Sequence, residues 1–203
     1  MFRRLADELG VVFVAVQGIE GTWSFPSAPH KRRDEFAFFD AVLQDLSMRH
    51  GVDPDRTMLT GFSSGGFMTW YLACDRPERF GGYAPIAGAF WQPLPPSCAG
   101  PVPYLFHVHG TTDAVVPLEG RALGGGRWRQ GDVFQSFEIW RRQLPADADS
   151  RQWVESGATE LRCESWTPAI GSLELCLHDG GHSLRGEWIS RAWRRLSQLR
   201  NWN

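Results

Sequence analysis

The pentapeptide Gly61-Phe62-Ser63-Ser64-Gly65 constrains the fold of this chain more than any other stretch of it. The residues before it, Arg56–Thr60, are typical of a short strand, and those after it, Phe67–Ala73, are typical of a buried helix. A serine between a strand and a helix, with a glycine two residues away on each side, is typical of a sharp turn that exposes the serine hydroxyl. The pattern therefore predicts a strand–turn–helix unit with Ser63 at its apex.

Two further polar residues follow strands in the order that such a serine requires. A nucleophilic serine needs a base, the base needs an orienting acid, and after this kind of turn the acid precedes the histidine. Asp113 follows the apolar strand Tyr104–His109, and His182 follows the strand Leu173–His178 in a glycine-rich loop. The carboxyl ends of parallel strands share one edge of the sheet, where open α/β sheets carry their sites. We therefore predict that Ser63, Asp113 and His182 converge as nucleophile, acid and base.

The assignment of the acid has an alternative. Asp179 lies only three residues before His182 and is the second candidate for the orienting acid. Taken singly, Asp113 also fits a turn or a cap, and His182 also fits a residue that merely precedes the last helix. Their order along the chain and their positions at strand ends favour the triad with Asp113.

The order of elements predicts the fold class. Strands alternate with helices, which favours a mainly parallel sheet flanked by helices. With 203 residues, of which 42% are hydrophobic and 22% charged, the chain is expected to form a single domain over residues 1–203. Helices are expected over Met1–Leu9, Asp34–Arg49, Asp132–Gln143 and Leu184–Leu199, and further strands over Val11–Val16, Gly82–Ala87 and Thr159–Ser165.

The chain resembles a known family, the extracellular esterases related to poly(3-hydroxybutyrate) depolymerases and feruloyl esterases. The matching residues span Leu5 to about Trp193 and are Gly51–Arg56, Thr60–Gly66, Leu72–Cys74, Pro85–Gly88, His107–Asp113 with Val116-Pro117, and Gly180–Ser183. The resemblance implies the α/β-hydrolase fold and a serine esterase that hydrolyses carboxylic esters of a polyester or a plant polymer. It makes Ser63 the nucleophile, Asp113 the acid and His182 the base, and it implies no cofactor and no metal. The N–H of Ser64 is expected to donate to the oxyanion, because the residue after the nucleophile supplies one such donor.

The chain departs from the family at its start. In the family several strands precede the first helix seen here, and a His-Gly loop after one of them supplies a second oxyanion donor. We therefore expect an N-terminally truncated fold in which the first strands and the oxyanion loop are missing. The sheet is then expected either to leave a gap beside Val11–Val16 or to pair that strand directly with Arg56–Thr60. Two alternative functions stay open, an incomplete homologue that is catalytically weak or non-catalytic, and a peptidase on the same fold.

The four cysteines permit two disulfides. Cys74 and Cys98 are expected at the same edge of the sheet, and Cys163 and Cys176 lie on two expected neighbouring strands, so the pairs 74–98 and 163–176 are geometrically natural. Four reduced core thiols are the alternative, and the spacings fit no zinc template. Disulfides would indicate an extracellular or periplasmic location, as the family implies, although no signal peptide is present in this chain.

The net charge, the lengths of the apolar runs and a few aromatic and histidine residues indicate which partners the chain can have. The net charge of −2 argues against nucleic acid, and no apolar run is long enough to span a membrane, which leaves an ester substrate as the expected partner. Trp23 and Trp91 follow strand ends, so they are candidates for lining a substrate site, with packing over loop bases as the alternative. His107 and His109 share one face of a strand, and without a third ligand we interpret them as buried, hydrogen-bonded histidines.

Overall fold

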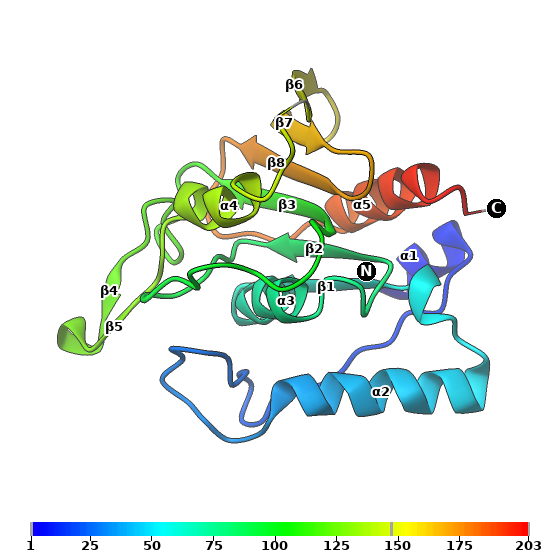
Figure 1. Ribbon diagram of the computed structural model, residues 1–203, viewed down its shortest axis with the longest axis horizontal. Coiled ribbons are helices and arrows are strands. Elements are labelled where there is room, and N and C mark those ends of the chain that lie inside the picture. The colour runs from blue at the N-terminus through cyan, green and yellow to red at the C-terminus, as the bar shows by residue number, and fades with distance from the viewer. Residues whose placement is uncertain (1, 147, 203) are drawn as a thin grey trace.

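The fold is built on a six-stranded sheet, seen in a computed structural model that describes residues 2–146 and 148–202 (Figure 1). The strand order is β1-β2-β3-β8-β7-β6, in which neighbours from β1 to β8 are parallel and β7 and β6 each run antiparallel to the preceding neighbour. The predicted mainly parallel sheet is confirmed. The strands are β1 (Met58–Phe62), β2 (Gly82–Ile86), β3 (Tyr104–Gly110), β6 (Asp149–Glu155), β7 (Leu161–Thr167) and β8 (Ser172–His178).

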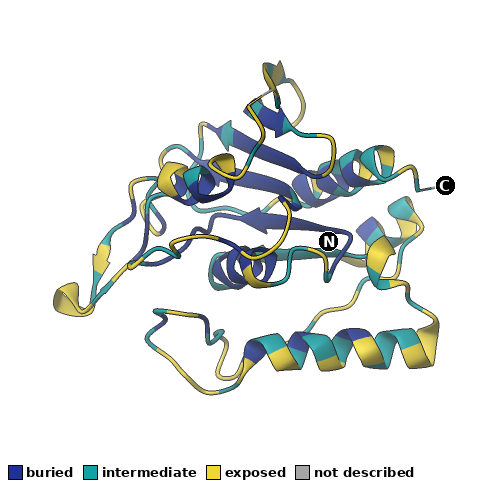
Figure 2. Ribbon diagram, viewed as in Figure 1, coloured by how far each residue is buried: buried dark blue, intermediate teal, exposed yellow. Residues whose placement is uncertain are grey.

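Helices cover both faces of the sheet. One apolar cluster joins α2, α3 and α4 to one face, and two further clusters join α1 and α5 to the other. The strands β2, β3 and β8 and the helix α3 are buried almost throughout (Figure 2). Such continuous burial is what parallel strands between two helical layers require. The helices are α1 (Phe2–Leu9), α2 (Glu35–His50), α3 (Ser64–Asp75), α4 (Val133–Arg141) and α5 (Gly186–Leu199), with a short 3-10 helix η1 (Pro54–Arg56).

The helix boundaries follow from capping chemistry. The Asp34 side chain accepts a hydrogen bond from the N–H of Ala37 at 3.0 Å, and the Asp132 side chain accepts one from Gln135 at 2.8 Å. Each aspartate satisfies an N–H that the first turn of a helix leaves unpaired, so α2 and α4 begin one residue after it. Gly51 ends α2 in the left-handed conformation, with φ 64°.

The predicted strand Val11–Val16 is wrong. Among the described residues, positions 11–16 form no strand, and β1 has a ladder partner on one side only, which is β2. The direct pairing with the strand before Ser63 is therefore not formed. Val12 and Val14 are 75% and 43% exposed. A strand needs a neighbour to satisfy its backbone groups, and the apolar composition of this segment does not supply one.

Two other segments differ from the sequence-based expectations. The two-stranded hairpin of β4 (Ala122–Leu123) and β5 (Trp128–Arg129), joined by the 3-10 turn η2 (Gly124–Gly126), projects from the body (Figure 1). This hairpin is not among the elements expected from the sequence. The strand β6 is not among the expected elements either; its sequence DSRQWVE is polar, and most of its residues are exposed. It forms an edge strand, where one face and one side meet water.

Both predicted disulfides are present. Cys74 at the end of α3 is bonded to Cys98 in the loop that precedes β3, and Cys163 on β7 is bonded to Cys176 directly opposite on β8. The first bond ties the helix after Ser63 to the segment leading into β3. The second joins the antiparallel part of the sheet to its parallel part.

Candidate active site

Ser63 occupies a strained turn between β1 and α3. Its φ is 56° and its ψ −114°, a conformation that side-chain-bearing residues rarely adopt. The N–H of Ser63 donates to Ile86 O at 3.0 Å, which anchors the turn to the end of β2. A Cβ on Gly61 would lie 2.2 Å from Gly65 O, so the turn closes only with glycine at position 61. The predicted strand–turn–helix unit is confirmed.

The structure brings Ser63, Asp113 and His182 together. His182 Nε2 lies 3.0 Å from Ser63 Oγ, and His182 Nδ1 lies 2.7 Å from Asp113 Oδ2. The Phe62 ring packs against the imidazole with 4.5 Å between ring centroids. Asp113 is 4% exposed, whereas the His182 side chain keeps 17% exposure. One imidazole thus bridges a hydroxyl and a buried carboxylate.

The two oxygens of Asp113 have different partners. Oδ1 accepts the backbone N–H groups of Val115 and Val116, both at 2.8 Å, and Oδ2 faces His182. Burial alone raises the pKa of Asp113, but the hydrogen bonds from Val116, His182 and Val115 outweigh it and leave the pKa below its usual value. The carboxyl group is therefore ionised at neutral pH, with one oxygen fixed by the backbone and the other available to the imidazole.

Backbone contacts hold the acid loop against the histidine loop. The N–H of Thr111 donates to His178 O at 2.9 Å, and the N–H of Thr112 donates to Gly180 O at 3.2 Å. A Cβ on Gly110 would lie 2.2 Å from Gly180 O, so glycine at position 110 allows this close approach. The loops after β3 and β8 are neighbours because these strands are paired along their whole length.

The alternative acid, Asp179, lies elsewhere. Its carboxylate pairs with the guanidinium of Arg162 on β7, with one N–O distance of 3.2 Å, and its side chain is 74% exposed. This pairing lowers the pKa of Asp179. The carboxylate that contacts His182 is that of Asp113.

The segment of residues 17–33 reaches the first turn of α3. Thr22 Oγ1 lies 3.2 Å from Ser64 Oγ. Trp23 packs against Phe38 and Phe39, and its Nε1 lies 3.8 Å from where a Cβ on Gly65 would be. Ser64 is the first residue of α3, so its N–H has no acceptor within the helix ladder. No sequence signal pointed to Thr22, which belongs to an irregular loop.

Trp91 is a packing residue. It is 5% exposed and packs edge-on against Phe25 and Phe67, with ring centroids 5.6 and 5.5 Å apart. A side chain buried in this way does not line a surface site in the described structure, so the predicted substrate-binding role of Trp91 is not supported. Trp23 is the one of the two candidates that is partly exposed and adjacent to the turn at Ser63.

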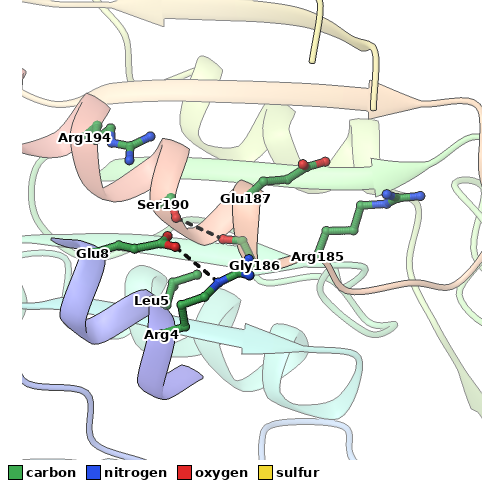
Figure 3. Close-up of a pocket in the computed structure, with 8 residues that line it drawn as sticks. All are labelled: Arg4, Leu5, Glu8, Arg185, Gly186, Glu187, Ser190 and Arg194. Atoms are coloured by element: carbon green, nitrogen blue, oxygen red, sulfur yellow. Dashed lines mark hydrogen bonds and ion pairs between the residues drawn. The ribbon is translucent and has the colours of Figure 1, made fainter. Parts of the chain in front are cut away.

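A cavity of about 450 Å³ lies away from these residues, between α1 and α5 (Figure 3). An Arg4–Glu8 ion pair at 3.2 Å lies on one side of it, and the hydrogen bond from Ser190 Oγ to Gly186 O lies on the other. It touches none of Ser63, Asp113 and His182. The complete lining is Arg4, Leu5, Glu8, Arg185, Gly186, Glu187, Ser190 and Arg194.

Neither a metal cluster nor a membrane helix is found in the part of the chain that the structure describes. No three or more His, Cys, Asp or Glu side chains of residues 2–146 and 148–202 are arranged to hold a metal ion. Within the same residues, no helix combines the length and the apolar character that crossing a bilayer requires.

The sheet, the strained serine turn and the positions of the acid and histidine loops define the α/β-hydrolase fold. The acetyl xylan esterase of Aspergillus awamori has the same fold, with a TM-score of 0.54 at 13% identity over 78% of this chain and 66% of that one. The chain has the α/β-hydrolase fold, and a family model described as phospholipase/carboxylesterase matches residues 35–124.

Relatives by sequence are named esterases. "Putative esterase NocK" of Nocardia uniformis subsp. tsuyamanensis is 34% identical over 204 residues, which cover 89% of this chain and 58% of NocK. Feruloyl esterase C of Emericella nidulans is 33% identical over 112 residues, which cover 54% of this chain and 38% of that enzyme. The resemblance to esterases of this superfamily is confirmed. The chain spans 58% of the length of NocK and 58% of the length of the probable feruloyl esterase C of Aspergillus terreus.

Proposed function

We propose that this protein is a serine esterase that hydrolyses carboxylic esters. The observation that supports the proposal is the hydrogen-bonded series Ser63 Oγ, His182 and Asp113, with distances of 3.0 and 2.7 Å. Ser63 is proposed as the nucleophile, His182 as the general base and then acid, and Asp113 as the residue that orients the imidazole.

The proposed reaction needs only these side chains, the N–H of Ser64 and water. Ser63 Oγ attacks the ester carbonyl while His182 Nε2 takes its proton, and the negative charge collects on the carbonyl oxygen. The N–H of Ser64, at the positive end of α3, donates to that oxygen. His182 returns the proton to the leaving alcohol, and water activated by the same nitrogen releases the acid from the acyl-enzyme.

The substrate class is taken from the relatives. Feruloyl esterases and a bifunctional acetylxylan esterase/xylanase are among the relatives by sequence, so we propose an ester of a plant polymer, with a polyhydroxyalkanoate polyester as the second substrate class. Trp23, which is partly exposed beside the turn at Ser63, is the candidate for contacting the acyl group. An extracellular or periplasmic location fits the two disulfides.

Fluorophosphonate labelling tests the proposal directly. We expect the folded protein to be labelled, the S63A variant to remain unlabelled, and p-nitrophenyl acetate to be hydrolysed by the former only. Methyl ferulate, a hydroxybutyrate oligomer and a peptide substrate then separate the two ester classes from a peptidase. A folded protein that neither labels nor hydrolyses any ester would overturn the proposal and favour a non-catalytic homologue.

A further inference from the structure

Beneath the acid loop lies a buried series of hydrogen bonds that the proposed reaction does not use. His107 and His109 on β3 are both 0% exposed and point to the face covered by α3 and α4. Trp70 Nε1 lies 3.3 Å from His107 Nδ1, and His107 Nε2 lies 2.9 Å from His109 Nδ1. His109 Nε2 lies 2.7 Å from Val116 O. The series therefore runs from the helix after Ser63 to the loop that carries Asp113.

The chemistry of the two ends fixes every proton in this series. An indole N–H only donates, so His107 Nδ1 is the acceptor and the proton of the neutral ring sits on Nε2. That proton is donated to His109 Nδ1, which leaves the second proton on His109 Nε2. A carbonyl oxygen only accepts, and Val116 O receives that proton. All six donor and acceptor positions agree with this one pair of tautomers.

The charge state of the rings agrees with the tautomers. Burial, reinforced by His109, outweighs a backbone hydrogen bond with Pro85 and holds the pKa of His107 well below its usual value. Burial also lowers the pKa of His109, against the hydrogen bond to Val116 and the charge of Asp113, while His182 and His178 lower it further. Both rings are therefore neutral at neutral pH, and each can donate one hydrogen bond and accept one.

The last bond of the series reaches the turn that fixes Asp113. Val116 accepts from His109 with its carbonyl oxygen and donates to Asp113 Oδ1 with its N–H at 2.8 Å. His109 thus holds Val116 through its carbonyl oxygen, and Val116 in turn holds one carboxylate oxygen of Asp113 through its N–H. His109 Nε2 is 3.7 Å from Asp113 Oδ2, beyond hydrogen-bond distance, so it acts on the carboxylate through Val116.

We infer that His109 is a positioning residue. By donating to Val116 O, it holds the turn of residues 113–116 so that Asp113 presents Oδ2 to His182, and Trp70 and His107 keep its proton on Nε2. This inference rests on the proposed function for its effect on turnover, whereas its effect on the geometry of Asp113 and His182 is independent of any activity.

Two substitutions of His109 separate the two bonds of its ring. The H109Q amide nitrogen can replace Nε2 and still donate to Val116 O, whereas the H109N side chain can replace Nδ1 and accept from His107 but cannot reach Val116. We expect H109N to lower kcat by about 10- to 100-fold with KM within about twofold, since small displacements of catalytic groups cost this much. H109Q should stay within about threefold of the wild-type kcat. L196A, which truncates a fully buried side chain elsewhere, serves as a control for lost stability alone.

A second readout does not depend on activity. The His182 Nδ1 proton, shared with Asp113, should give a low-field NMR resonance that persists in H109Q and L196A and disappears in H109N. If H109N does not fold, H109L replaces it, because leucine has a similar size but cannot donate to Val116 O, so the same losses are expected. Equal kcat and an unchanged resonance in folded H109N would overturn the inference. An active-site resonance that responds as expected in a protein without esterase activity would overturn only the proposed function.

Discussion

Replacing Asp113 with asparagine tests how the site orients its histidine. In the wild type, Oδ1 accepts two backbone N–H groups, from Val115 and Val116, and Oδ2 faces His182. An asparagine at this position has one oxygen and one NH₂ group. If the NH₂ group faced the two backbone donors, both would lose their acceptor, so the amide must keep its oxygen there and turn the NH₂ group towards His182.

The consequence is a reversed imidazole. An NH₂ group that faces His182 Nδ1 makes this nitrogen an acceptor, so the proton of the neutral ring moves to Nε2, the atom that faces Ser63 Oγ. The ring is then unable to take the serine proton. In a serine protease triad the same change lowers kcat by about 10⁴-fold, which corresponds to about 5.4 kcal/mol of transition-state free energy. We expect a loss of similar size for D113N, with the fold retained because both backbone donors stay paired.

The assay is hydrolysis of p-nitrophenyl acetate together with the rate of fluorophosphonate labelling. D179N is the matched control, because Asp179 lies three residues from His182 in sequence but pairs with Arg162 on the surface. We expect D179N to keep kcat within about twofold of the wild type. A folded D113N variant with more than about a tenth of the wild-type kcat would refute the reasoning, as would a loss in D179N as large as that in D113N.

Two further predictions concern stability. Because the folded protein lowers the pKa of His107 and His109 below 6.5, the unfolded chain binds more protons below that pH, and the free energy of unfolding should fall as the pH drops from 7 to 5. Urea unfolding should show a slope of up to about 1.4 kcal/mol per pH unit for each histidine, and a flat curve would contradict this. Replacing Cys74 and Cys98 together with alanine opens a loop with a sequence separation of 24, which should lower the free energy of unfolding by about 3.5 kcal/mol. A loss below about 1 kcal/mol would show that the unfolded chain is not constrained by this bond.

The sequence contains enough information to predict that Ser63, Asp113 and His182 converge, because all three follow strand ends. A serine on a strand–turn–helix unit, and an acid and a histidine after later strands, need only a parallel sheet to converge. The two cysteine pairs were predictable for the same reason, since each pair belongs to segments that the sheet brings together. The contacts that hold the loops of the candidate site in place could not be predicted in this way. The contact of Thr22 with Ser64 and the donation from His109 to Val116 depend on loop paths that no periodicity encodes.

The strands show where pattern reasoning fails. The segment of residues 11–16 has the composition of a buried strand, but no described strand lies beside it, and a strand exists only through its ladder. The opposite error occurs at β6, whose polar sequence is missing from the expected strands. It pairs along its full length with β7, because an edge strand with one exposed face needs little apolar surface.

The helix α3 relates the separate parts of the candidate site to one another. Ser63 precedes its first turn, Trp70 begins the buried hydrogen-bond series about two turns later, and Cys74 ties its last turn to the segment before β3. The positions of Ser63 and of the loop that carries Asp113 thus both depend on one buried helix. His182 is held differently, since backbone bonds tie its loop to the acid loop, and its side chain is 17% exposed whereas that of Asp113 is buried. The packing of Phe62, the residue before Ser63, against the imidazole therefore helps to keep His182 within hydrogen-bond reach of Ser63.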